Sequence, residues 1–413
     1  MVRRIVFLFI LLISQCCIAL AQQKLIVGLK EKYTTIEKAL AASKNGDEII
    51  VKKGIYPSLN TVINKSITLT GQGQPVLDGK GKDEVLTILA NGVTVNGFII
   101  KNTNNGSSKD YAGIRVFKAN NVKIINNTLQ NTFFGIYLSD ADDVLVSNNN
   151  LTGTGHPTQS GNGIHLWQCN RIKIENNTIR RHRDGIYFEF AKQSLIQNNL
   201  SEQNNRYGLH FMFSDDDKYI GNTFRNNGSG VAVMYTKRIT MLKNVFEKNT
   251  GSSSYGLLLK DISDSRIEYN KFSLNTTGIY FEGCSRINVT NNDFFQNGWA
   301  IRLLANCESD HFENNNFKGN TFDLSTNGTH FQNKFINNYW DKYEGYDMDR
   351  NKIGDVPYRP VSLYSQVLEK MPYAVMLMRS LMVNLLDKAE KAIPSITPEI
   401  IKDEQPRMQS IAR

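Results

Sequence analysis

The stretch Gly208-Leu-His-Phe-Met-Phe-Ser-Asp215 is followed, about 22 residues on, by Gly230-Val-Ala-Val-Met-Tyr-Thr-Lys237. Both begin with a glycine, an aliphatic residue, a variable residue and an apolar residue. This pattern returns about every 22 residues, which identifies a repeat protein. Copies begin at Gly113, Gly135, Gly163, Gly185, Gly208, Gly230, Gly256 and Gly278, with a variant at Ala300.

The repeat bodies indicate short β-strands. They are rich in Val, Ile, Phe and Thr at alternating positions, and Asn and Gly stand between them. A period near 22 is shorter than that of helical repeats such as tetratricopeptide units. We therefore predict an all-β fold, a right-handed parallel β-helix of about 22-residue coils. Paired asparagines such as Asn126-Asn127 and Asn291-Asn292 should stack as amide ladders at one corner.

The first residues differ from the repeats. Residues 1–21 combine Arg3-Arg4, an apolar run and Ala19-Leu-Ala21, a pattern typical of a secretory signal peptide. We therefore predict export of the mature chain. A short amphipathic helix over 34–40 should then cover the open core of the first coil.

Three further regions follow the signal peptide. We expect the β-helix to span residues 24–340, with the clearest repeats over 113–335. Residues 341–360 hold a sequence similar to a calcium loop, and residues 361–413 form a helical tail. The net charge of +9 is spread along the chain without a basic stripe of stacking aromatics, so nucleic acid is not an expected partner.

The outward residues of the coils contain a candidate metal site. The third and fifth residues of the pattern should point out of the coil. Met212 and Met234 then lie on adjacent coils, His210 lies two residues before Met212 on the same face, and His165 and Glu189 lie to one side. Thioether and imidazole groups suit Cu(I), so these residues are the candidate copper ligands. The alternative is an apolar patch covered by a loop or partner.

A second constellation suggests sugar chemistry. Residues 180–184 read Arg-Arg-His-Arg-Asp, with Tyr187 and the acidic run 215–217 nearby in the repeat. Polysaccharide lyases and epimerases on this fold use such bases beside acidic groups to act on uronates. The alternative is a solvated charged corner.

The region after the repeats carries oxygen ligands at alternate positions. Asp347, Asp349, Asn351 and Asp355 follow the spacing of a calcium loop. Lys352 stands where the EF-hand turn requires glycine, and Tyr358 stands where it requires glutamate. Calcium binding and a purely structural turn are both compatible with this sequence.

The tail contains an apolar helical segment over residues 372–391. Pro372 suits a first helical turn, and the following residues are apolar on most faces but too few to span a bilayer. Such a helix must pack on the last coil, a membrane surface or another protein. The residues expected to dock are Pro372, Tyr373, Met376, Met378, Leu381, Met382 and Leu385.

Three cysteines follow the signal sequence. Cys169 should lie about five coils from the others, too far for a disulfide. Cys284 and Cys307 fall on neighbouring coils and are within reach of each other. Whether they pair stays open at this point.

With these features together, the chain resembles the NosD family of nitrous oxide reductase maturation proteins. The resemblance covers nearly the whole chain after the signal sequence. It is carried by residues 207–215, Met234-Tyr235, Asn338-Tyr-Trp340, residues 353–360 and the apolar C-terminal helix.

The resemblance implies a periplasmic accessory protein that is not itself an enzyme. Such proteins work with an ABC transporter permease and its ATPase, receive copper from a copper-chaperone lipoprotein, and help load nitrous oxide reductase. It supports His210, Met212 and Met234 as a transient Cu(I) site and residues 372–391 as the region facing the permease at the membrane. His165 departs from the family, where an aromatic residue is frequent. The alternatives are a secreted uronate lyase or epimerase and a passive binding scaffold.

Overall fold

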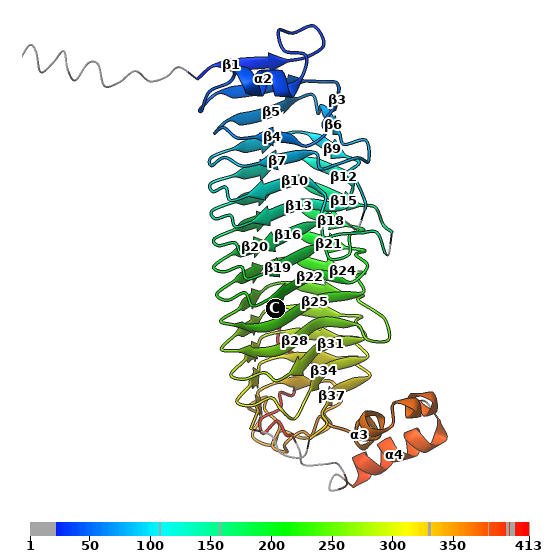
Figure 1. Ribbon diagram of the computed structural model, residues 1–413. Coiled ribbons are helices and arrows are strands. Elements are labelled where there is room, and N and C mark those ends of the chain that lie inside the picture. Colours follow the sequence, from blue (N-terminus) through cyan, green and yellow to red (C-terminus); the bar gives the residue numbers. More distant parts are fainter. Residues whose placement is uncertain are drawn as a thin grey trace, which may run out of the picture.

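The computed structural model describes residues 22–106, 109–156, 158–328, 332–378, 380–393, 396 and 401–412. The expected signal peptide, residues 1–21, lies outside this set. The described chain is wound into a parallel β-helix with three sheets along its length (Figure 1). The predicted fold class is therefore confirmed.

Each complete coil contributes one strand to each sheet, and the coils at the two ends contribute fewer. The first sheet contains β1 (Lys24–Val27), β2 (Glu48–Lys52), β5 (Thr68–Gln72), β8 (Thr94–Asn96), β11 (Lys123–Ile125), β14 (Leu145–Ser147), β17 (Lys173–Glu175), β20 (Leu195–Gln197), β23 (Lys218–Ile220), β26 (Thr240–Leu242), β29 (Arg266–Glu268), β32 (Asn288–Thr290), β35 (His311–Glu313) and β38 (Lys334–Ile336). The second sheet contains β4 (Thr61–Ile63), β7 (Leu86–Ile88), β10 (Ala112–Phe117), β13 (Phe134–Ser139), β16 (Ile164–Trp167), β19 (Ile186–Glu189), β22 (Tyr207–Met212), β25 (Ser229–Lys237), β28 (Tyr255–Ser263), β31 (Thr277–Glu282), β34 (Trp299–Leu303) and β37 (Phe322–Ser325). The third sheet contains β3 (Ile55–Pro57), β6 (Val76–Asp78), β9 (Ile99–Lys101), β12 (Thr128–Thr132), β15 (Asn150–Gly153), β18 (Thr178–Arg180), β21 (Leu200–Glu202), β24 (Thr223–Arg225), β27 (Val245–Glu247), β30 (Lys271–Ser273), β33 (Asp293–Phe295), β36 (Asn316–Lys318) and β39 (Tyr339–Trp340).

The repeating glycines stand where neighbouring coils approach most closely. A Cβ on Gly230 would lie 2.3 Å from the carbonyl oxygen of Gly256, and one on Gly135 would lie 2.4 Å from that of Gly163. A side chain does not fit at these distances. The glycine pattern therefore reports the stacking of the second sheet, which carries the candidate copper ligands.

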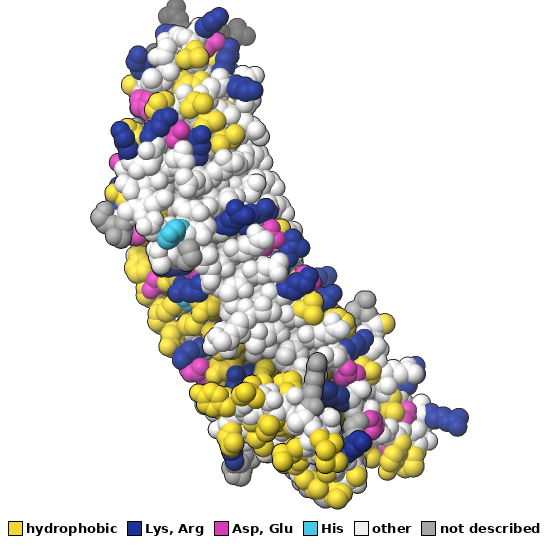
Figure 2. Space-filling model, turned by 90° about the vertical axis from the view of Figure 1, so that its right-hand side faces the viewer, with side chains coloured by type: hydrophobic (Ala, Val, Ile, Leu, Met, Phe, Trp, Pro, Cys, Tyr) yellow, Lys and Arg dark blue, Asp and Glu magenta, His cyan; other side chains and the backbone are white. Residues whose placement is uncertain are grey.

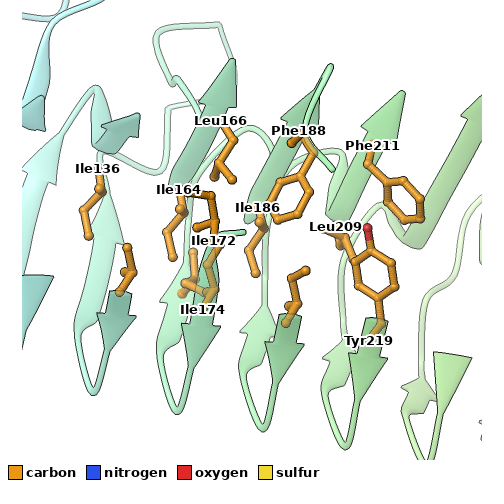
Figure 3. Close-up of a cluster of buried hydrophobic side chains, with 14 of the residues drawn as sticks. Ile136, Ile164, Leu166, Ile172, Ile174, Ile186, Phe188, Leu209, Phe211 and Tyr219 are labelled. Carbon is orange, nitrogen blue, oxygen red and sulfur yellow. The ribbon is translucent and has the colours of Figure 1, made fainter. Parts of the chain in front are cut away.

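Alternate residues of each strand fill the core. On β19 and β22, Ile186, Phe188, Leu209 and Phe211 have no exposed surface, and they stack on their equivalents in the next coil (Figure 3). This continuous column of apolar contacts makes the solenoid a stiff support for the residues on its outside.

The paired asparagines form the predicted ladder. The first residue of a pair has a left-handed backbone (φ 57° at Asn126), which turns the corner. The second is buried: Asn127 Nδ2 donates to Asn149 Oδ1 at 3.1 Å, and Asn149 Nδ2 donates to Asn177 Oδ1 at 3.0 Å. The same link continues through Asn199, Asn222, Asn244, Asn270, Asn292 and Asn315 to Asn338.

A short helix covers the first coil. Helix α2 (Ile36–Ala42) begins after Thr35, whose hydroxyl accepts a hydrogen bond from the Lys38 amide. Ile36 and Ala39 are buried against the core. The predicted helical cap is therefore present, two residues further along the chain than the expected start.

The C-terminal helices project from the other end of the solenoid (Figure 1). They are α3 (Leu363–Lys370), the 3-10 helix η1 (Pro372–Leu377) and α4 (Leu381–Ala392). The sequence predicted one continuous segment from Pro372, but η1 ends at Leu377 and Ser380 caps a new helix by accepting from the Val383 amide. Within the described residues, no helix is both long and apolar enough to cross a membrane.

Apolar packing and an ion pair fix the helices to the last coil. Tyr364 and Leu368 pack with Phe322 of β37. Arg302 of β34 donates to both carboxylate oxygens of Glu369, at 2.8 and 2.9 Å, and the Ser325 hydroxyl donates to the same carboxylate.

The final segment, residues 401–412, returns to the solenoid; we call it the terminal strap. Asp403 is buried, and its Oδ2 accepts from the Asn338 amide, from Asn338 Nδ2 and from Trp340 Nε1, all at 2.9–3.0 Å. Arg407 N donates to the Asn338 carbonyl, and Ile411 exchanges two hydrogen bonds with the Asn316 side chain. Asp403 thus supplies the acceptor at the end of the asparagine ladder.

Candidate functional site

The two candidate methionines are neighbours in the second sheet. Met212 of β22 and Met234 of β25 are register partners, and Glu189 of β19 is the register partner of Met212 on the other side. Parallel strands lie about 4.8 Å apart, so the two methionine side chains start from adjacent positions. Both are half-buried. The expected methionine column is therefore present.

His210 lies in the adjacent column, and its side chain is covered. Only 6% of the residue is exposed, so the expectation of an open imidazole is wrong. The ring lies between Tyr187 and Tyr207, at centroid distances of 5.1 and 5.0 Å. His210 points out of the coil, as the alternating pattern predicts, but the rings of Tyr187 and Tyr207 cover it.

One edge of the His210 ring is held by charged groups. Nδ1 lies 3.2 Å from Arg206 Nη2 and 3.6 Å from Asp184 Oδ2, and Arg206 is paired with Asp184. Burial acts to raise the pKa of Asp184, but hydrogen bonds from Arg206 and His210 outweigh it and hold that pKa below its ordinary value. The opposite nitrogen, Nε2, is buried without a hydrogen-bond partner in the part of the chain that is described.

The two remaining candidate ligands are engaged elsewhere. His165 pairs in register with Tyr187 and stacks on it at 4.9 Å, and Asn162 Nδ2 contacts its Nδ1 at 2.9 Å. Burial lowers the pKa of His165 to about 3, so the ring is neutral. Glu189 accepts the Tyr187 hydroxyl at 2.8 Å. Neither residue is directed to the methionine pair by these contacts.

An aromatic strip that the repeat pattern did not predict borders the methionines. Phe190, Phe213 and Tyr235 directly follow Glu189, Met212 and Met234, with ring centroids 5.3 and 5.2 Å apart and 40–43% exposure. All three have left-handed backbones, φ 50–55°, which bulky residues rarely adopt. The strip could have been predicted from the sequence, because these three consecutive repeats all have an aromatic residue at the same position after the repeat glycine.

The constellation proposed for uronate chemistry is occupied by structural contacts. Arg180 pairs with Glu202, and Arg238 pairs with Asp216. Asp217 is fully buried, accepts the Ser194 amide and the Tyr219 hydroxyl, and has its pKa raised by burial. Arg180, Asp216 and Asp217 are thus each held by structural contacts, whereas Asp184 and Tyr187 lie beside His210.

The loop similar to a calcium site is closed by its own backbone. Asp347 accepts from the Asn351 and Lys352 amides at 3.0 and 2.8 Å, and Asp355 accepts from the Met348 amide at 2.7 Å. Asn351 donates to Asp349 through Nδ2 at 2.9 Å. This is the hydrogen bonding of a structural turn. Calcium binding there stays a prediction.

His, Cys, Asp and Glu side chains do not gather in groups of three that could hold a metal ion anywhere in the described ranges. The candidate copper ligands are the methionine pair and His210. Thioether sulfur is a soft donor that favours Cu(I), and an imidazole nitrogen complements it.

The predicted docking residues form an apolar surface on the C-terminal helices. Tyr373 and Met376 of η1 are 88% and 85% exposed, and Leu381 and Met382 of α4 are 75% and 71% exposed. Met378 and Leu385 are also exposed, while Ala374 and Val383 face Phe322. Hydrophobic side chains gather at this end of the molecule (Figure 2). Exposed patches of this kind mark interaction sites.

The solved structures that resemble this chain share its fold. The A-module of the mannuronan C-5 epimerase AlgE4 from Azotobacter vinelandii superposes with a TM-score of 0.54 over 74% of this chain and 88% of its own, at 16% identity. At that identity the likeness extends to the fold alone. The class defined is therefore a parallel β-helix protein.

The sequence comparisons are more specific. Residues 147–348 match the family described as "Periplasmic copper-binding protein (NosD)". The "Probable ABC transporter binding protein NosD" of Stutzerimonas stutzeri is 27% identical over 196 residues, which are 43% of this chain and 44% of that protein. Its counterpart in Pseudomonas aeruginosa is 27% identical over 161 residues, 39% of this chain and 33% of that protein. The chain thus spans less than half the length of these relatives. It is a NosD-like parallel β-helix protein.

Proposed function

We propose that the chain is a periplasmic accessory protein that relays copper to nitrous oxide reductase together with an ABC transporter. The family that it matches is described as copper-binding and periplasmic, and its relatives are named for ABC transporter binding. The observation that carries the proposal is the register pairing of Met212 with Met234, on the strand whose His210 has an Nε2 that finds no hydrogen-bond partner among the described residues.

The ligand geometry suits transient binding. The two thioethers hold Cu(I) at the surface, and His210 adds its Nε2 while Asp184 and Arg206 hold its Nδ1. Because thioethers are neutral and the methionines are half-buried, an ion held there can be passed to another protein, unlike an ion in a closed cage. Copper is cargo in this role, and the protein needs no enzymatic chemistry of its own.

The aromatic strip gives the partner a surface next to the ion. The side chains of Phe190, Phe213 and Tyr235 are about 40% exposed beside the methionines. Exposed apolar patches of this kind mark interaction sites. In this proposal, the copper-chaperone lipoprotein and nitrous oxide reductase dock in turn on this strip.

The test is an anaerobic Cu(I) competition titration of the wild type and the Met212→Ala, Met234→Ala double variant. We expect one bound Cu(I), with affinity at least ~10-fold weaker in the variant. The matched control is Met348→Ala, Met371→Ala, which removes two methionines that are 76% and 61% exposed elsewhere. Equal affinity in all three proteins would reject this copper site.

The apolar face of η1 and α4 is proposed to dock on the transporter permease at the membrane. The double change Met376→Glu, Leu381→Glu places charges on this face without touching Ala374 or Val383, which pack inward. We expect co-purification with the permease and ATPase to be lost, while Met348→Glu leaves it unchanged. Retained co-purification of the double variant would place the transporter contact elsewhere.

A further inference from the structure

The last coils of the solenoid bring two thiols together. Cys284 and Cys307 occupy the same corner of neighbouring coils, one residue before the bridge pair Ser285 and Glu308. The Cys284 amide lies 3.4 Å from Cys307 Sγ, and the Cys284 carbonyl accepts from the Glu308 amide at 3.0 Å. Directly stacked residues on parallel strands have the Cα separation that a disulfide requires.

We propose that Cys284 and Cys307 form a disulfide bond that joins these two coils in the exported protein. The bond forms by thiol–disulfide exchange with a disulfide-bonded oxidant. Both cysteine S–H bonds break and one S–S bond forms, while the oxidant's disulfide is reduced to two thiols that take up the two protons and two electrons.

The surroundings favour a disulfide over a metal bound by both thiols. The two residues are only 1% and 2% exposed. Burial raises the pKa of the Cys284 thiol, and its hydrogen bond with Cys307 acts in the same direction while lowering the pKa of Cys307. A Cu(I) ion held by two thiolates would carry a net negative charge in this buried place, whereas a disulfide is neutral.

Burial also sets when the bond must form. Exchange requires access of the oxidant to a sulfur atom, which the closed coil does not allow. The reaction therefore precedes closure of the coil that carries Cys307, during folding after export. Cys169 lies in a distant coil, where burial raises its pKa to about 12, so it serves as an internal control that stays a thiol.

The experiment is peptide mapping of the full chain exported to a bacterial periplasm, with free thiols trapped by alkylation in acid-quenched, denatured samples. Trypsin releases Cys284 within residues 272–286 and Cys307 within residues 303–318. We expect these peptides to be recovered linked, to separate on reduction, and to be unlinked from a host that lacks its dithiol oxidase. The Cys169 peptide should be alkylated in every sample.

Two results would overturn the proposal. One is recovery of both peptides singly alkylated from the oxidising host. The other is a stoichiometric Cu(I) adduct that requires both cysteines in the native protein. In the Cys284→Ser variant, alkylation of Cys307 confirms that its partner was Cys284; a continued block of Cys307 would assign it a different partner and reject the pair.

Discussion

Replacing Asp403 with alanine should release the terminal strap from the solenoid. The carboxylate Oδ2 accepts three hydrogen bonds, from two donors on Asn338 and one on Trp340, and Oδ1 accepts the Gln405 amide at 3.1 Å. The variant leaves the three buried donors without an acceptor. Each buried donor left without an acceptor lowers the stability by about 1–3 kcal/mol. Water can reach these donors as the strap moves, so we take the low end of this range, which gives about 3 kcal/mol for the three donors.

That free energy is predicted to be lost locally, because each coil of a solenoid contacts only its neighbours. A loss of about 3 kcal/mol raises the open population of the strap about 100-fold. Native-state hydrogen exchange of the Asp403 and Arg407 amides, which donate to the Tyr358 and Asn338 carbonyls, should accelerate by that factor. Exchange in β22 and β25 should stay unchanged.

The matched control is Glu404→Ala, which removes an adjacent carboxylate that is 53% exposed and paired with Lys402. Exposed ion pairs contribute about 0–1 kcal/mol, so exchange should change by less than about 5-fold. The reasoning is refuted if Asp403→Ala leaves Arg407 protected, or if it accelerates exchange equally along the whole solenoid.

Three further changes test other parts of the molecule. Burial raises the pKa of Asp310 to about 7 in the folded chain, so the folded state binds the proton more tightly and stability falls as pH rises from about 4 through 7. Asp310→Asn should therefore be more stable than wild type by about 4 kcal/mol at pH 8 and equal to it near pH 4, in urea unfolding at each pH. Asp184→Asn weakens the hold on His210 Nδ1, and Cu(I) affinity should fall about 10-fold with Met212 and Met234 intact, whereas an unchanged titration would remove Asp184 as a positioning residue. Glu369→Ala breaks the bidentate pair with Arg302, and limited proteolysis should cut within α3 to α4 several-fold faster, while equal rates would mean that packing on Phe322 suffices.

The repeats made the solenoid predictable because the reasons for its sequence pattern are local. Gly230 must be glycine to let the next coil approach, and Asn127 must be asparagine to link the ladder. The register of Met212 and Met234 follows from those two constraints alone. The helical cap was also accessible, since Thr35 provides a standard N-terminal hydrogen bond.

Features that depend on contacts distant in sequence were not predictable in the same way. Burial of His210 arises from Tyr187, Tyr207 and the Asp184–Arg206 pair, which period-two alternation does not represent. Asp403 and Asn338 are 65 residues apart in the sequence, and no repeated pattern predicts their contact. The break in the apolar tail depends on Ser380, which caps α4. A serine side chain can cap a new helix or lie within a continuing one, so the sequence alone did not show that the helix breaks there.

Closing the solenoid at both ends affects how molecules meet one another. A parallel β-helix is built by adding one coil onto the edge of the last, and an uncovered final coil offers the same edge to the first coil of another molecule. Helix α2 covers one end, and the terminal strap takes up Asn338, Trp340 and the backbone of the last coil at the other. The strap therefore occupies, at the last coil, hydrogen-bonding groups that a second molecule would need for end-to-end stacking, and Asp403 accepts three of those bonds.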